Sequence, residues 1–256
     1  MQHLSLLLKD RKMERIAKVI ARSGHCSRRE AEKLIIEGKV MLDGQLITSP
    51  ALNVPTDANI TIDGKPLAKQ EETRLWLYYK PTDLITTHKD TEGRKTVFES
   101  LPPEMKRVIS IGRLDINTEG LLLLTNNGEL ARHLELPSTG WIRRYRVRVY
   151  GNVDEAKLAS LKNGLSIEDE KTGKEINYKS IGAKLDSKPK GKNAWITISI
   201  SEGKNREVRK ICQHLGLQVN RLIRLSYGPF LLGNLEPGEF KEVSRKVIKE
   251  QIGGFV

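Results

Sequence analysis

An unbroken run of leucines from Leu121 to Leu124 is the feature that most limits what this chain can fold into. Four consecutive apolar residues next to a polar loop are typical of a strand that is buried on both faces of a sheet. Such a strand needs a covering layer on each side. The run therefore predicts that the larger part of the chain is built in layers around a central sheet.

The periodicity elsewhere indicates which elements form those layers. Segments of strand character and segments of helical character are interleaved, and they are Leu75–Tyr79, Tyr145–Tyr150 and Trp195–Ser201 for strands and 126–134, 154–163 and 207–215 for helices. Several strands are too close in sequence to be joined only by the crossovers that parallel neighbours require. We therefore predict an α+β fold with a mixed, largely antiparallel sheet flanked by helices.

A smaller unit is expected before this sheet. Apolar spacing predicts helices over 13–23 and 28–37, and the second has a capping box formed by Ser27 and Glu30, with a glycine stop at Gly38. Short alternating strands then precede two Asp-Gly pairs, which are hairpin signals. The polar stretch Ala68–Thr73 has the composition of a linker. We expect one domain over 13–72 and a second over 73–256.

The charge of the chain points to a polyanionic partner. Its 256 residues contain 44 Lys and Arg against 32 Asp and Glu, for a net charge of +12. A membrane is the weaker candidate partner, because no apolar run approaches the roughly 20 residues of a spanning helix. The opening residues lack a charged leader and a cleavage site, which predicts a cytoplasmic protein.

No metal or redox chemistry is expected. Cys26 and Cys212 belong to no CxxC pair, and the five histidines show no metal-ligand spacing. Motifs for serine hydrolysis, for a phosphate-binding loop and for dinucleotide binding are also missing from the sequence. We therefore predict no metal and no cofactor.

The positive charge is concentrated in three segments. Lys9–Arg29 has eight basic residues against two acids, Gly203–Arg224 has six against one, and Trp141–Tyr150 has four arginines and no acid. A solvated surface is the alternative interpretation of any one of them. We predict that the phosphates of a nucleic acid are bound by Arg15, Arg22, Arg28, Arg29, Arg113, Arg143, Arg144, Lys204 and Arg206.

The first of these segments resembles a known RNA-binding domain. The sequence RIAKVIARSGHCSRREAEKLIIEGKVMLDG is similar to the S4 domain, first described in a ribosomal protein. The resemblance extends over roughly Met13 to Glu72 and implies a helix-helix-hairpin fold that binds RNA.

The segment GRLDINTEGLLLLTNNGEL, residues 112–130, resembles the RsuA family of pseudouridine synthases. The matching positions are Gly112, Arg113, Leu114, Asp115, Thr118, Gly120 and the leucine run. The resemblance implies that Asp115 is the catalytic nucleophile, whereas composition alone favours an aspartate that caps a turn. A glycosidase pair of Asp115 with Glu119 is disfavoured, because nothing else indicates a sugar cleft.

Two further motifs of the same family assign partners to Asp115. In EGKNREVRK, residues 202–210, the resemblance implies that Arg209 pairs with Asp115, which must be ionised to react. In RRYRV, residues 143–147, it implies that Tyr145 stacks on the target base. A phosphate-binding arginine and a core tyrosine are the alternatives for these two residues. The family usually has KPxG where this chain has Lys80-Pro81-Thr82-Asp83, which leaves the shape of that loop open.

The implied reaction converts a uridine to its carbon-linked isomer after the nucleotide is flipped out of the RNA. Asp115 can attack the base or assist its departure from the sugar, and the sequence does not choose between these routes. The segment 205–209 is closer to family members acting on the large subunit, which favours 23S rRNA or an assembly intermediate as partner. The alternative is a noncatalytic, ribosome-associated RNA-binding factor. Without an exposed apolar heptad, we expect a monomer.

Overall fold

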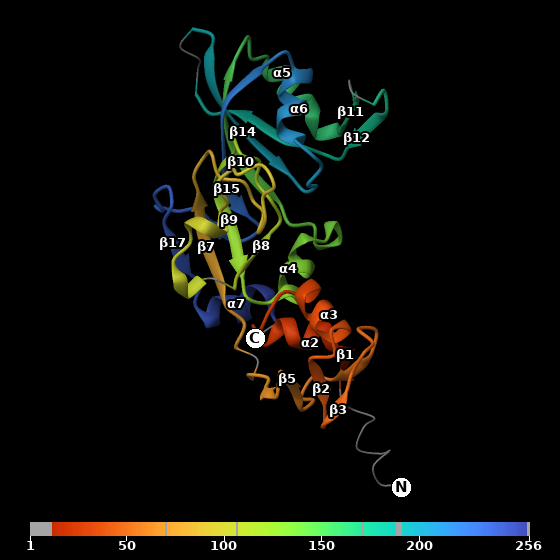
Figure 1. The fold of residues 1–256 in the computed structure, drawn as a ribbon. Helices are drawn as coiled ribbons and strands as arrows, with labels where there is room; N and C mark the ends of the chain where they lie inside the picture. Colours follow the sequence, from red (N-terminus) through yellow and green to blue (C-terminus); the bar gives the residue numbers. More distant parts are fainter. Residues whose placement is uncertain (1–11, 70, 106, 170–171, 188–190, 255–256) are drawn as a thin grey trace. The chain divides into compact units, whose positions relative to one another are not determined.

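The computed structural model describes residues 12–69, 71–105, 107–169, 172–187 and 191–254 (Figure 1). The opening segment, on which the expectation about a leader depends, lies outside these ranges. The chain divides into two compact units, one up to Thr73 and one from Arg74. Each unit has its own apolar core.

The described residues of the first unit form two helices and six short strands. They are β1 (Met13–Arg15), α2 (Ile16–Arg22), α3 (Arg28–Ile36), β2 (Val40–Leu42), β3 (Gln45–Leu46), β4 (Asn53–Pro55), β5 (Ile60–Ile62) and β6 (Lys65–Pro66). Strands β3, β2, β5 and β6 form one antiparallel sheet in that order, and β1 pairs with β4. The helices and strands share a core that includes Ile16, Ile20, Ile35, Val40 and Ile60.

Local signals in this unit behave as predicted. The Ser27 hydroxyl accepts a hydrogen bond from the Glu30 amide at 3.3 Å, and the Ser27 amide donates to the Glu30 carboxylate at 2.8 Å. Asp43 and Asp63 have φ of 48° and 49° and each precedes a glycine that also has positive φ. Two successive residues with positive φ are what tight hairpins require.

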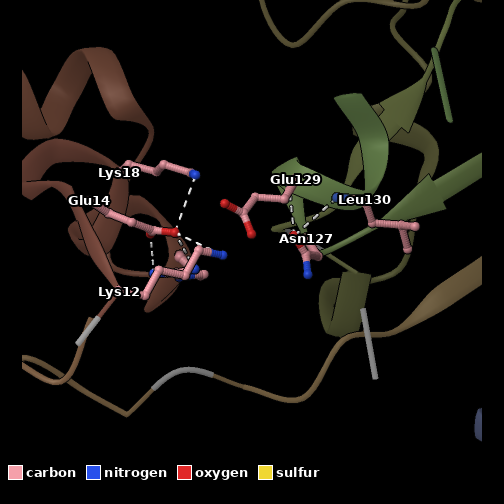
Figure 2. Close-up of polar contacts among 7 residues, drawn as sticks. Lys12, Glu14, Lys18, Asn127, Glu129 and Leu130 are labelled. Atoms are coloured by element: carbon pink, nitrogen blue, oxygen red, sulfur yellow. Dashed lines mark hydrogen bonds and ion pairs between the residues drawn. The ribbon is translucent and has the colours of Figure 1, made fainter. Parts of the chain in front are cut away.

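The start of the first helix differs from the prediction. Met13–Arg15 is a strand paired with β4, and the helix begins only at Ile16. The pairing buries Glu14, which forms ion pairs with Lys12, Lys18 and Arg22, the first two at 3.4 Å (Figure 2). A buried carboxylate needs such partners. The strand Met13–Arg15 was not predicted because its pairing partner, β4, is distant in sequence, whereas apolar periodicity reports only on nearby residues.

The second unit is built around one mixed sheet. The helices and strands of the unit are β7 (Leu75–Lys80), β8 (Ile109–Ile111), β9 (Glu119–Thr125), α4 (Gly128–Glu135), β10 (Arg143–Tyr150), α5 (Glu155–Ser160), β11 (Leu165–Glu168), β12 (Glu175–Tyr178), β13 (Gly182–Leu185), β14 (Asn193–Ile200), α6 (Glu207–His214), β15 (Gln218–Tyr227), β16 (Phe230–Leu231), β17 (Phe240–Glu242) and α7 (Arg245–Ile252). The path through the sheet is β13-β14-β10-β15-β9-β7-β17. Of its pairings within the described residues, β15 with β9 is parallel and the others are antiparallel, which confirms the predicted fold class.

Two apolar clusters cover the sheet. One contains alternate residues of β10 and β14 together with α5 and α6, and the other contains α4 and α7 with β7 and β9 (Figure 1). All residues of β9 are buried, as the leucine run predicts. Within the part of the chain that the structure describes, no helix is long and apolar enough to cross a membrane.

Local caps fix where the helices of this unit begin. The Asn127 side chain accepts hydrogen bonds from the amides of Glu129 and Leu130 at the start of α4 (Figure 2). The Asp154 carboxylate does the same for α5. Side-chain acceptors at this position satisfy amides that the first helical turn leaves without partners.

Gly120 is required where β9 passes β15. Its φ is +100°, and a Cβ at this position would lie 2.4 Å from the carbonyl oxygen of Arg224 and 2.7 Å from its nitrogen. Both obstacles are backbone atoms of the adjacent strand. The glycine therefore allows the parallel contact between the two strands.

We expect Gly120→Ala to lower the free energy of unfolding by about 3 kcal/mol or more, because overpacking against backbone adds to the strain of positive φ. Gly93→Ala is the matched control, since Gly93 has φ +73° with no atom within 4 Å of the added Cβ; it should cost only about 1–2 kcal/mol. Urea unfolding measures both. Equal losses would contradict the argument.

Candidate active site

Asp115 lies in the loop between β8 and β9. The loop closes on itself through a hydrogen bond from the Thr118 amide to the Asp115 carbonyl at 3.0 Å. The hydroxyl of Thr86 donates to the Leu114 carbonyl at 3.0 Å and accepts from the Leu114 amide at 3.3 Å. The Gly112 amide donates to the Glu135 carboxylate at 2.6 Å. The backbone before Asp115 is thus fixed by contacts from other segments, and the turn after it is closed by a hydrogen bond within the loop.

Lys80 provides the most buried of these contacts. Its side chain is fully buried at the end of β7, and its ammonium donates to the carbonyls of Pro81 and Thr118 at 2.9 Å each and of Ile116 at 3.4 Å. Burial lowers the pKa of Lys80 to about 8, although the nearby carboxylates of Asp83 and Asp115 act in the opposite direction. A buried ammonium with three donors therefore joins the end of β7 to the Asp115 loop.

The loop after Lys80 adopts a conformation that usually belongs to glycine. Asp83 has φ +67°, its amide donates to the Ile116 carbonyl at 3.0 Å, and its carboxylate accepts from the Thr82 hydroxyl at 3.1 Å. Aspartate tolerates this left-handed region better than most residues. The aspartate at the position where the resemblance expects glycine therefore keeps a turn that contacts the Asp115 loop.

The carboxylate of Asp115 forms an ion pair with Arg206, not with Arg209 as the sequence analysis expects. The distance from Arg206 Nη1 to Asp115 Oδ2 is 3.6 Å, and the two side chains are 50% and 36% exposed. Arg206 has φ +50° just before α6. The sequence does not reveal this left-handed backbone conformation, which sets the direction in which the Arg206 side chain points.

Arg209 contacts the backbone of the Asp115 loop. Its Nη2 donates to the Asn117 carbonyl at 2.8 Å and lies 3.5 Å from the Thr118 hydroxyl. Its Nε is buried and has no hydrogen-bond partner among the described residues. Burial and the neighbouring Arg206 lower the pKa of Arg209, whereas the Asp115 carboxylate raises it.

Asp115 opens into a cleft of about 690 Å³. The cleft is lined by more basic than acidic residues: Arg113, Arg143, Lys204, Arg206, Arg209 and Arg224 against Asp115, Glu135, Glu202 and Glu207. Tyr145, on β10, lines the same cleft and is 8% exposed. The three residues expected to act in catalysis therefore meet in one positively charged cleft. Among the described residues, no cluster of His, Cys, Asp and Glu is arranged to hold a metal ion.

Arg224 and Arg143 form part of this cleft from β15 and β10. Arg224 is 2% exposed, its Nε donates to the Leu121 carbonyl at 2.6 Å, and its Nη2 has no hydrogen-bond partner in the described part of the chain. Arg143 donates to the Tyr227 hydroxyl at 2.8 Å and to the Glu202 carbonyl at 3.0 Å. Both guanidinium groups stack on the Tyr227 ring.

The residues predicted to bind RNA fall into different environments. Those with exposed side chains are Arg15, Arg28, Arg29, Arg113, Arg144 and Arg206. Arg22 is bound to Glu14 within the first unit, and Lys204 is bound to Glu202 and to the carbonyl of Asn177. Arg143 and Arg144 lie on opposite faces of β10, since the first is buried and lines the cleft while the second is exposed.

Sequence reasoning missed Lys80 and Arg224. Both are charged residues that lie at buried positions of their strands, LWLYYK and QVNRLIRLSY. A basic residue at a position that alternation assigns to the interior is the signal that identifies such groups. Lys80 binds backbone carbonyls of the Asp115 loop. Arg224 binds the Leu121 carbonyl on β9.

Comparisons with known proteins identify the family of this chain. Residues 74–214 match the family described as RNA pseudouridylate synthase, and residues 14–60 match the S4 domain. A solved structure titled as a pseudouridylate synthase superimposes with a TM-score of 0.63 and 25% identity, over 93% of this chain and 99% of that chain. The fold is therefore that of an RNA-modifying isomerase, and the chain belongs to the pseudouridine synthase family.

Two curated relatives indicate which members of the pseudouridine synthase family this chain resembles. An uncharacterized RNA pseudouridine synthase of Rickettsia bellii is 52% identical over 93% of this chain and 100% of its own length. A protein of Salmonella typhi named ribosomal large subunit pseudouridine synthase B is 43% identical over 84% of this chain and 74% of its own length. The chain is thus a family member with an S4 domain, similar to the large-subunit enzymes named B.

The lowered pKa of Lys80 predicts a pH dependence of stability. Between the folded pKa of about 8 and the ordinary value of 10.5, the unfolded chain binds more protons at Lys80 than the folded chain does. Raising the pH through this window should therefore stabilise the folded state, by on the order of 1–3 kcal/mol. Urea unfolding at each pH, compared with Lys80→Met, isolates the contribution. A constant difference between the two proteins across this window would contradict it.

Proposed function

We propose that this protein is an rRNA pseudouridine synthase that isomerises a uridine of 23S rRNA, with Asp115 as the nucleophile. The observation that carries the proposal is the Asp115 carboxylate, which is fixed by its backbone and open to a positively charged cleft. The large-subunit target is supported by the relatives named ribosomal large subunit pseudouridine synthase B. We also propose that the protein acts as a monomer in the cytoplasm, on rRNA or on an assembly intermediate.

The reaction breaks the bond between uracil N1 and the ribose C1′ and forms a bond between uracil C5 and C1′. The proton on C5 leaves and N1 gains one, so the product is an isomer and no redox partner is needed. In one route Asp115 adds to the base, and in the other it assists departure of the base from C1′. Both routes require an ionised carboxylate that reaches a nucleotide flipped out of its helix.

Each neighbour of Asp115 has a role that follows from its contacts. Arg209 holds the loop through the Asn117 carbonyl and so positions the carboxylate. Arg206, which is half exposed, balances the charge of Asp115 before the substrate enters. Tyr145 offers an aromatic ring in the same cleft on which the flipped uracil stacks. The basic lining attracts phosphates, so RNA affinity should fall steeply with salt.

The S4 unit contributes to RNA binding and takes no part in the reaction itself. Arg15, Arg28 and Arg29 are exposed on it. A noncatalytic RNA-binding factor is the alternative function, and an open cleft with a fixed carboxylate favours the enzyme. A carbodiimide that marks pseudouridine, followed by mapping of reverse-transcription stops, tests this on 23S and 16S transcripts incubated with the protein.

We expect a new stop on 23S rRNA with the native protein and none with Asp115→Asn. Because asparagine keeps the size of the side chain, RNA affinity should stay within a few fold, and filter binding measures it. Glu119→Gln is not a suitable control, since Glu119 binds Arg221; Glu104→Gln, at an exposed position, should retain full activity. Turnover by Asp115→Asn would remove Asp115 from the role of nucleophile. A stop on 16S rRNA alone would overturn the proposed target.

The two arginines near Asp115 should differ in their effects. Arg209→Gln is expected to lower the single-turnover rate about 100-fold, because displacement of a reacting group by ~1 Å has an effect of this size. Arg206→Gln should lower that rate less than about tenfold, since an exposed ion pair contributes little. Rapid-quench assays on saturating RNA compare the two variants. The opposite ranking would assign the positioning of Asp115 to Arg206.

A further inference from the structure

We infer that the second unit has a separate RNA-docking surface on the side of its sheet that faces away from the catalytic cleft. The inference extends the proposed function, because it assumes a folded RNA as the partner. The surface is defined by Arg144, Arg146 and Arg148 on β10, Lys184 on β13 and Trp195 on β14. None of these residues lines the cleft.

The alternation of β10 separates the two surfaces. Its burial pattern changes at every residue, so that Arg143, Tyr145, Val147 and Val149 face the interior and the residues between them are exposed. Tyr145 lines the cleft. Side chains of adjacent residues in a strand point to opposite faces of the sheet, so the three exposed arginines lie on the face opposite Tyr145.

Strand register extends the arginine row sideways. Arg146 lies opposite Thr197 on β14, and Thr197 lies opposite Lys184 on β13. Arg148 lies between Trp195 on β14 and Arg221 on β15. Residues two apart in a strand are separated by about 6.7 Å, and neighbouring strands by about 4.8 Å. The cations therefore form a two-dimensional array on this face of the sheet.

Few acids neutralise this array. Asp186 binds Arg146 at 3.1 Å and the Thr197 hydroxyl at 2.6 Å, while Glu119 binds Arg221 at 2.6 Å. Arg144, Arg148 and Lys184 have no carboxylate partner among the described residues. Arg146 also stacks on Trp195, with its guanidinium carbon 4.7 Å from the ring centroid. Arg146 is therefore held in place by its neighbours, whereas Arg144, Arg148 and Lys184 are available to bind an anion.

A polyanion with regularly spaced charges fits this array best. The phosphate backbone of an RNA helix presents such charges, and guanidinium groups bind phosphates with paired hydrogen bonds. The surface lies on the far side of the sheet from Asp115, so the segment it binds is not the segment whose uridine enters the cleft. The partner is therefore a second helix of the same folded rRNA.

The test uses the full chain with Arg144→Gln, Arg148→Gln and Lys184→Gln combined. The matched control removes three exposed lysines elsewhere on the same unit, Lys241→Gln, Lys246→Gln and Lys249→Gln. Both sets change the net charge equally. All six residues are exposed, so thermal unfolding should shift little and loss of the fold is not a confounding result. Binding is measured with both sets in the Asp115→Asn background, which separates it from turnover.

We expect the first triple variant to bind a 23S rRNA transcript at least tenfold more weakly near physiological salt. The slope of log affinity against log salt should become shallower by about 2 to 3, since each lost phosphate contact contributes slightly less than one. The control should stay within twofold of the parent. With Asp115 restored, turnover of a short stem-loop carrying the target uridine should be unchanged, because that RNA reaches only the cleft.

A second measurement locates the contact directly. Asn193 is exposed and pairs with Tyr150 on the same face, so a photocrosslinker on Asn193→Cys, with the two native cysteines replaced by serine, should attach to the transcript. The same probe on Lys249→Cys should not. Equal affinities for the two triple variants, or no crosslink at position 193, would overturn the docking surface. Loss of binding to phosphatidylglycerol vesicles but not to RNA would assign the face to a membrane and also overturn it.

The two proposals fail separately. Unchanged docking by the triple variant, together with active turnover of the stem-loop, would remove only the second surface. Normal docking without any pseudouridine would remove only the proposed reaction.

Discussion

The buried ammonium of Lys80 is the interaction on which the arrangement of the site depends. A charged group is costly to bury unless its donors are satisfied. The acceptors of Lys80 are the carbonyls of Ile116 and Thr118, which follow Asp115 in its loop, and the carbonyl of Pro81. The β7 strand and the Asp115 loop can therefore move apart only if a buried charge loses its partners. Arg209 adds a second cation that binds the same loop from α6. The nucleophile proposed here owes its position to these backbone contacts more than to its own ion pair.

The alternation of β10 places adjacent residues of one strand on opposite faces of the sheet. Arg143 is used inside the unit, where it binds Tyr227 and the Glu202 carbonyl. Tyr145 lines the cleft, and Arg144, Arg146 and Arg148 are exposed on the other face. Charge counting along the sequence treats all four arginines as one basic patch. Their separation follows only from the direction of each side chain in a strand.

Local signals were the part of the fold that the sequence predicted well. The capping box of Ser27 and Glu30, the Asp-Gly hairpins and the buried β9 strand each depend on residues that are close in sequence. Strand β1 was missed because it exists only through its pairing with β4. The ion pair of Asp115 was assigned to Arg209 instead of Arg206 because the positive φ of Arg206 depends on how α6 begins. Arg224 was missed because its partner, the Leu121 carbonyl, belongs to another strand.

The close contact at Gly120 has a consequence for how substrates are selected. Because β9 pairs with β15 at Arg224, the start of β9 just after the Asp115 loop is joined directly to the β15 side of the cleft. A cleft whose walls are joined by strand pairing resists reshaping around different RNA helices, so the deformation falls on the RNA. Among uridines of equal chemistry, those in weakly stacked or mismatched positions would then react first, and the ease of local RNA melting would rank the sites.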